Sequence, residues 1–127
     1  MNKILLVFFG GGAGSLARYL VGMLALRTLG PGWPYGTFAV NVIGGFVMGF
    51  LTATLAFRGG DHQERWRLLI AVGVLGGFTT FSSFSLETAA MIERKDYGEA
   101  FGYVTVSVIL SISALFVGLA AARRLFA

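Results

Sequence analysis

The stretch Gly73-Val-Leu-Gly-Gly-Phe-Thr-Thr-Phe-Ser-Ser-Phe-Ser-Leu-Glu87 decides the fold of this chain. It lies inside an apolar run long enough to cross a membrane, yet it concentrates glycines and then hydroxyl side chains. Glycines weaken a helix interior, and clustered hydroxyls compete for backbone hydrogen bonds. Non-helical backbone at membrane depth is tolerated only where protein buries it or where it lines a cavity. We therefore predict a membrane helix broken near its middle, between Gly76 and Thr80.

The composition indicates an all-α integral membrane protein. The chain has 127 residues, of which 56% are hydrophobic and 13% charged, and its mean hydropathy is +0.78. We expect a single transmembrane domain over residues 1–127. The absence of cysteine excludes thiolate chemistry. The apolar segments contain no metal-ligand cluster and no nucleophile–base pair, so we expect no enzyme. The positive charges stand at segment ends, which favours lipid bilayer rather than nucleic acid as the partner.

Four stretches are apolar over about the 20 residues that a spanning helix needs. They run roughly over residues 4–26, 37–57, 66–92 and 100–122. Thr37 is a candidate N-cap of the second. Four spans place both termini on one side, and six Lys and Arg residues on that side against three on the other favour termini in the cytoplasm. Glycine faces on the first two spans predict close helix packing and, with so thin a wall, a homodimer.

Arg18 and Asn41 are polar residues inside the first two spans. Arg18 either reaches a lipid headgroup or faces the protein interior and binds carbonyls, with attraction of anions near a pore mouth as a further role. Asn41 is either hydrogen-bonding glue between helices or an N–H donor to an anion. Glu87 needs a hydroxyl or Arg18 as a partner unless it lies near the far interface.

The third and fourth spans carry an aromatic pair and a polar stripe. Phe81 and Phe84 stand three residues apart and share a side of the second half-helix. They either contact lipid and pack, or present ring edges, which are electropositive, to an anion. Tyr103, Ser107 and Ser111 recur every four residues, either as packing contacts or as the wall of a hydrated path. Carbonyls freed by the break would favour a cation. An anion would instead need neutral donors, for which the candidates are Asn41, Thr79, Ser82, Ser107 and Ser111.

Two motifs together resemble the Fluc/CrcB family of fluoride channels. They are Gly36-Thr-Phe-Ala-Val-Asn-Val-Ile-Gly-Gly45 and Gly76-Gly-Phe-Thr-Thr-Phe-Ser-Ser-Phe-Ser-Leu-Glu87. The likeness extends to Gly14, Arg18 and the Tyr103 stripe, and so covers nearly the whole chain. The resemblance implies a four-helix subunit with a broken third helix, assembled as an antiparallel, dual-topology homodimer with two fluoride pores.

The resemblance also implies site residues. Phe81 and Phe84 would form an aromatic box, and the rest of the fluoride pore would comprise Asn41, Thr80, Ser83, Tyr103, Ser107 and Ser111. A structural Na⁺ at the dimer interface would be held by backbone carbonyls that map to Gly76 and Thr79. Arg18 and Glu87 belong to the pattern without an assigned role.

The function implied is passive, highly selective export of cytoplasmic fluoride across the cell membrane, which relieves fluoride toxicity. One alternative is a proton-coupled fluoride transporter, for which Glu87 is the only titratable candidate on the path. Another is a helix-packing subunit of a larger complex, which alone would move no ion.

Overall fold

The structure is a computed structural model and describes residues 2–127. Within these residues the fold is entirely helical, and four helices are long and apolar enough to cross a membrane. The first is α1 (Lys3–Leu29), the second α2 (Tyr35–Arg58) and the last α6 (Tyr97–Phe126). Each extends a few residues beyond the span expected for it. The prediction of four spanning helices is confirmed.

The third spanning helix is assembled from several pieces. Its first half comprises η1 (Gly60–His62), α3 (Gln63–Trp66), the wider π-helix η2 (Arg67–Leu75) and α4 (Gly76–Phe78). Its second half is α5 (Ser82–Glu93). Thr79 between them is extended, with φ −86° and ψ 159°. The predicted break is confirmed, and it occupies residues 79–81, at the C-terminal edge of the expected region.

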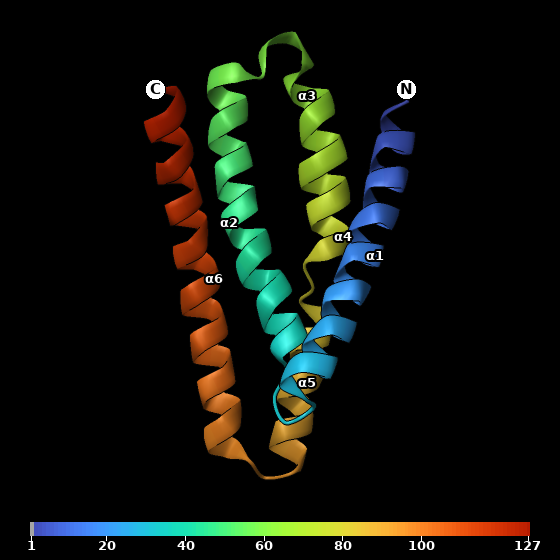
Figure 1. The fold of residues 1–127 in the computed structure, drawn as a ribbon, viewed down its shortest axis with the longest axis vertical. Coiled ribbons are helices and arrows are strands. Elements are labelled where there is room, and N and C mark those ends of the chain that lie inside the picture. The colour runs from blue at the N-terminus through green and yellow to red at the C-terminus, as the bar shows by residue number, and fades with distance from the viewer. Residues whose placement is uncertain (1) are drawn as a thin grey trace.

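The four spans form two close pairs. The main partner of α1 is the first half of the third helix, and that of α2 is α6. Both termini and the turn at residues 59–62 lie at one end of the molecule, and residues 30–34 and 94–96 lie at the other (Figure 1). The basic residues counted in the sequence therefore divide between the two ends as expected.

Glycine allows each pair to pack backbone against backbone. A Cβ at Gly10 would collide with the Leu69 carbonyl oxygen and come within 3.1 Å of the Gly73 Cα. A Cβ at Gly49 would collide with the Leu115 carbonyl oxygen in the same way. Small residues at such positions let helices approach closely, which is how membrane helices gain contact without a hydrophobic driving force. The predicted close packing at glycine is confirmed, and these contacts lie within one subunit rather than between two copies.

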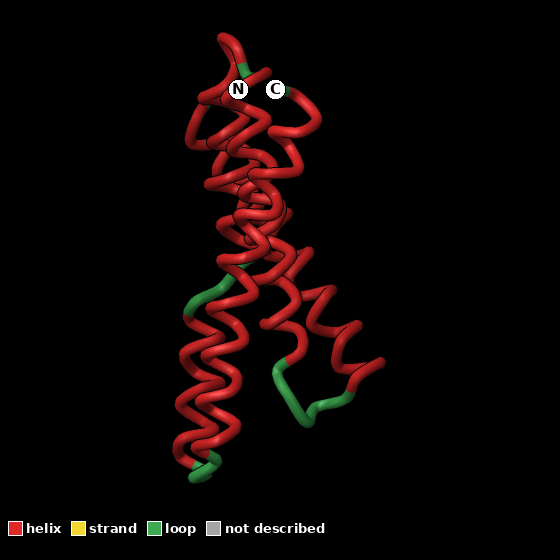
Figure 2. Tube along the Cα trace, turned by 90° about the vertical axis from the view of Figure 1, so that its left-hand side faces the viewer, coloured by secondary structure: helices red, strands yellow, loops and turns green. Residues whose placement is uncertain are grey.

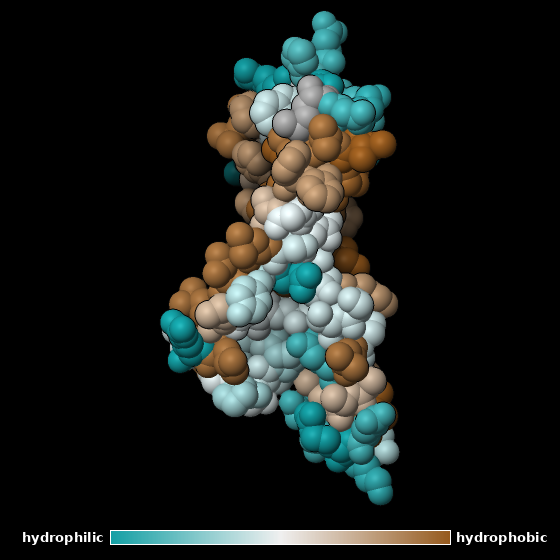
Figure 3. Space-filling view, turned by 90° about the vertical axis from the view of Figure 1, so that its right-hand side faces the viewer, coloured by the Kyte–Doolittle hydropathy of each residue, from teal (hydrophilic) through white to brown (hydrophobic). Residues whose placement is uncertain are grey.

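The outer surface is apolar where a bilayer would contact it. Large hydrophobic side chains are widely exposed, among them Phe8, Leu24, Phe101 and Phe116. In the space-filling view, hydrophilic side chains gather at the two ends, with a brown band in the upper half and a paler hollow below it (Figure 3). This surface suits lipid rather than water.

Below the break the helices separate into two legs (Figure 2). One leg is α5 with the start of α6, joined by the turn at residues 94–96. The other is the end of α1 with the start of α2, joined by the loop at residues 30–34. The break thus redirects the chain, and cavities open around it and between the legs.

Candidate functional site

Asn41 fastens the break from the neighbouring helix. Its Nδ2 donates to the Thr80 carbonyl oxygen at 3.0 Å, and its Oδ1 accepts from the Thr80 amide at 2.8 Å. Both backbone groups of one non-helical residue are thereby satisfied, as buried backbone requires. The interhelical reading of Asn41 is confirmed, and its second N–H remains available to a ligand.

The break frees two backbone carbonyls. In a continuous helix the amides of Thr80 and Ser83 would donate to the carbonyls of Gly76 and Thr79. Here the Thr80 amide donates to Asn41 Oδ1 at 2.8 Å, and the Ser83 amide donates to Thr80 Oγ1 at 3.1 Å. The latter bond satisfies an amide in the first turn of α5. The two carbonyls predicted to hold a cation have therefore lost their helical donors.

A cavity of about 380 Å³ opens between the break, α2 and α6. It gathers six of the eight predicted fluoride-pore residues: Asn41, Thr80, Phe81, Phe84, Ser107 and Ser111. Apolar side chains complete its wall, namely Met48, Val108, Ile112 and Leu115. None of the described side chains that line it carries a formal charge.

Two hydroxyls in this cavity are left without partners. Ser107 is 5% exposed. The Oγ atoms of Ser107 and Ser111 are buried and make no hydrogen bond within residues 2–127. A buried polar group without a partner costs about 1–3 kcal/mol. Both serines belong to the lining of this one cavity, which makes it the candidate ligand site.

Phe81 and Phe84 lie together at the mouth of this cavity. Their ring centroids are 5.7 Å apart and the ring planes are tilted by 49°. Phe84 is half-buried and lies 5.1 Å from the Tyr103 ring, whereas Phe81 is 77% exposed. One ring is thus fixed by packing, and the other projects away from the subunit.

A hydrogen-bonded trio lies next to Phe84 and comprises Tyr103, Glu87 and Thr37. The Tyr103 hydroxyl donates to Glu87 Oε1 at 2.9 Å, and the Thr37 hydroxyl donates to Glu87 Oε2 at 2.9 Å. Glu87 therefore has the hydroxyl partners that one reading of the sequence required. Thr37 is not a helix cap, because α2 begins two residues earlier with Pro34 before it. That prediction was wrong, and Thr37 serves Glu87 instead.

Arg18 and Ser83 lie apart from the first cavity. They share a second cavity of about 310 Å³ with Tyr19, Thr37 and Thr80. Arg18 Nε donates to the Gly77 carbonyl oxygen at 3.0 Å. Arg18 thus faces the protein interior and binds a carbonyl of the broken helix, as one of its two readings predicted.

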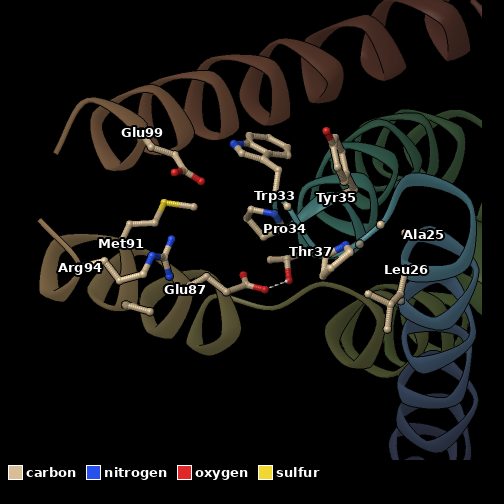
Figure 4. A pocket seen from close by; sticks show the side chains of 16 residues that line it. Ala25, Leu26, Trp33, Pro34, Tyr35, Thr37, Glu87, Met91, Arg94 and Glu99 are labelled. Carbon is tan, nitrogen blue, oxygen red and sulfur yellow. Dashed lines mark hydrogen bonds between the residues drawn. The ribbon is translucent and has the colours of Figure 1, made fainter. Parts of the chain in front are cut away.

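A third cavity, of about 390 Å³, lies between the two legs. Glu87, Arg94 and Glu99 reach into it, together with Trp33 and Met91 (Figure 4). Thr37 and Glu87 line this cavity but not the first, and both are linked to Tyr103 through the hydrogen bonds of Glu87. The two carboxylates make the third cavity far less suited to an anion than the first.

Two of the predicted donors are already engaged. The Thr79 hydroxyl donates to the Leu75 carbonyl oxygen at 2.8 Å, and the Ser82 and Thr80 hydroxyls contact each other at 3.3 Å. The unengaged neutral donors of the first cavity are thus the two serine hydroxyls and one N–H of Asn41. Sequence reasoning missed Thr37 as a site residue, although its spacing of four from Asn41 puts both on one face of α2.

The fold and these cavities define a class: a small membrane protein with a broken helix beside an uncharged cavity lined by polar groups and aromatic rings. The family described as "CrcB-like protein, Camphor Resistance (CrcB)" matches residues 5–119. The chain belongs to this family.

Named relatives match over almost the whole chain. A protein of Caulobacter vibrioides (strain NA1000 / CB15N) is 64% identical over 127 residues, which cover 100% of both chains. A protein of Phenylobacterium zucineum (strain HLK1) has the same identity and coverage. One of Mesorhizobium japonicum is 51% identical over 98% of this chain and 99% of its own. Each is named "Fluoride-specific ion channel FluC". With its four spanning helices, this chain is a multi-pass protein of the cell membrane.

Proposed function

We propose that this protein is a passive, highly selective fluoride channel that lets cytoplasmic fluoride leave the cell and so reduces fluoride toxicity. The observation that carries the proposal is the pair of buried, unpaired hydroxyls on Ser107 and Ser111, two residues that line the same uncharged cavity as Phe81 and Phe84. The name shared by the relatives supports the same ion.

The chemistry of the cavity suits a small anion. An anion that leaves water needs donors to replace its hydration shell. Ser107, Ser111 and Asn41 each offer one, and aromatic ring edges carry partial positive charge. Because the donors are neutral, each binds the ion less strongly than a buried lysine would. Conduction requires such a balance, since an ion has to leave as readily as it binds.

A homodimer would complete the path. The 77% exposure of Phe81 leaves its ring largely uncovered in one subunit. In our proposal a second, antiparallel copy covers Phe81, so that two pores form at the interface between subunits of opposite topology. Among soluble oligomers the two-fold symmetric dimer is the commonest assembly.

The same interface would hold a structural Na⁺. The carbonyls of Gly76 and Thr79 have lost their helical donors to Asn41 and Thr80, and Gly76 is exposed on the subunit surface. Hard oxygen donors of this kind fit a cation such as Na⁺. A bound ion would be coordinated by four such carbonyl oxygens, two from each subunit, and would tie the broken helices together.

The alternative, a proton-coupled fluoride transporter, would require Glu87 to exchange protons during transport. Both carboxylate oxygens of Glu87 accept hydrogen bonds, from Thr37 and Tyr103. These bonds tie Glu87 to α2 and α6, and Glu87 is not among the residues that line the first cavity. The relatives, moreover, are named as channels. We therefore favour the passive pore.

Fluoride efflux from liposomes tests the proposal. Purified protein is reconstituted with potassium fluoride or potassium chloride inside, and valinomycin balances the charge. A fluoride electrode should record release within seconds of adding valinomycin, and a chloride electrode should record none. Absence of fluoride release from folded protein would instead support the packing-subunit hypothesis.

A further inference from the structure

Trp33 lies in the loop between α1 and α2. It is next to the candidate site but outside the sequence motifs that predicted that site. Interactions within the loop fix its backbone conformation. Gly30 adopts φ 81°, a conformation that favours glycine, and the Tyr35 amide donates to the Trp33 carbonyl oxygen at 2.8 Å. Pro31 and Pro34 fix two further backbone angles. The loop therefore presents Trp33 in one defined position.

The indole of Trp33 packs into an aromatic cluster at the foot of the ion path. Its ring centroid lies 5.1 Å from that of Tyr103, with an interplanar angle of 82°, and 5.2 Å from that of Phe38. Tyr103 is 1% exposed and belongs to a buried core with Met91 and Ala100, against which Trp33, Phe38 and Phe84 pack. Edge-to-face contacts of this kind fix the orientation of a ring.

Tyr103 connects Trp33 to the site through contacts with Phe84 and Glu87. Its ring also contacts Phe84, at 5.1 Å between centroids, and its hydroxyl donates to Glu87 Oε1. A tyrosine hydroxyl oxygen lies on the long axis of its ring, so a displacement of the whole ring would carry the hydroxyl away from the carboxylate.

The two tryptophans of the chain differ in surroundings. A tryptophan at a membrane surface is ordinarily an interfacial anchor. Trp66, 48% exposed at the opposite end of the molecule, fits that role. Trp33 is half-buried, with its ring against three aromatic neighbours, and borders the cavity into which Glu87 reaches (Figure 4).

We propose that Trp33 is a positioning residue of the ion path: its indole holds the Tyr103 ring so that the hydroxyl meets Glu87 beside Phe84. The proposal rests on the proposed channel function. It assigns to the α1–α2 loop a part in conduction that acts through Tyr103.

A double-mutant cycle tests it, with the fluoride efflux rate per reconstituted protein as the readout. Trp33→Leu should slow efflux about three- to tenfold, the scale of one or two lost ring pairs. Trp33→Phe, which keeps a ring, should retain most of the rate. In protein that already carries Tyr103→Phe, and so has no hydroxyl to position, Trp33→Leu should slow efflux by less than about twofold more.

The matched control is Trp66→Leu, which should leave the rate unchanged. Full-rate efflux by Trp33→Leu would overturn the proposal, and so would effects of Trp33→Leu and Tyr103→Phe that simply multiply. If the unsubstituted protein releases no fluoride, the channel function fails instead, and the two failures are thus distinguishable.

A second measurement keeps Trp33 and so avoids any folding defect. The chain has two tryptophans, so Trp66→Phe makes Trp33 the sole indole emitter. The further substitution Tyr103→Leu should shift its emission to longer wavelength, because Trp33 loses the ring against which it packs, whereas Tyr103→Phe, which keeps the ring, should not. Unchanged emission after Tyr103→Leu would contradict the proposal.

Discussion

Asn41 holds both backbone groups of Thr80: its amide nitrogen lies 3.0 Å from the Thr80 carbonyl oxygen, and its amide oxygen lies 2.8 Å from the Thr80 nitrogen. An amide side chain thereby replaces the hydrogen bonds that a continuous helix would have supplied. The interruption of the third helix thus depends on a residue 39 positions earlier in the chain.

Asn41→Asp should reduce fluoride efflux by about tenfold or more. The carboxylate keeps the acceptor for the Thr80 amide, but it loses both N–H donors and repels an anion. Asn2→Asp is a matched control, because Asn2 caps α1 through its side-chain oxygen, which aspartate retains. Normal efflux by Asn41→Asp in the electrode assay would remove Asn41 from the ion path.

Phe81→Ile should sharply reduce efflux and leave the proposed dimer intact. Isoleucine preserves apolar bulk but has no electropositive ring edge. Phe101→Ile is the control, since Phe101 on α6 is about as exposed, at 75%, and lies outside the cavity. Size-exclusion chromatography reports the dimer and the electrode reports the flux. Equal rates for the two variants would show that the Phe81 ring does not contact fluoride.

Ser107→Ala should slow efflux without lowering thermal stability. The hydroxyl makes no bond within the described residues, so its removal relieves a desolvation cost of about 1–3 kcal/mol. If Ser107 served only in helix packing, Ser107→Ala would leave the efflux rate unchanged. Ser113→Ala, at an exposed position of α6, is the control. A melting temperature measured together with the rate separates the two roles.

Glu87→Gln should leave a conducting pore. Glutamine can still accept from Thr37 or Tyr103, and a passive path needs no proton exchange at this position. A proton-coupled transporter would lose transport in the same variant. Fluoride efflux measured at two external pH values with valinomycin present distinguishes a channel from a proton-coupled transporter. For a passive channel we expect the same efflux rate with and without a pH gradient.

The sequence predicted the break because Gly76, Gly77 and the following hydroxyls contradict a helix within an apolar run. It also predicted the polar face of α6, since Tyr103, Ser107 and Ser111 repeat every four residues. Both predictions follow from helical periodicity and local backbone preference, so neither required knowledge of long-range contacts.

Contacts between residues far apart in the chain could not be predicted from the sequence. Thr37 stands where a cap belongs, and nothing local shows that Glu87, 50 residues later, takes its hydroxyl instead. The partner of Arg18 likewise depends on how α1 packs against α4. Trp33 lies between Pro31 and Pro34 in the sequence, and only the folded loop shows that its ring packs against Tyr103.

The most direct test of the central claim is the reversal potential of the current through protein in a planar bilayer. A tenfold fluoride gradient is imposed at equal chloride and equal pH on the two sides. A passive, fluoride-selective pore predicts reversal at about 59 mV, the value for a tenfold gradient of a monovalent ion, and no shift when a pH gradient is added. Reversal near zero, or a potential that follows the pH gradient, would contradict it.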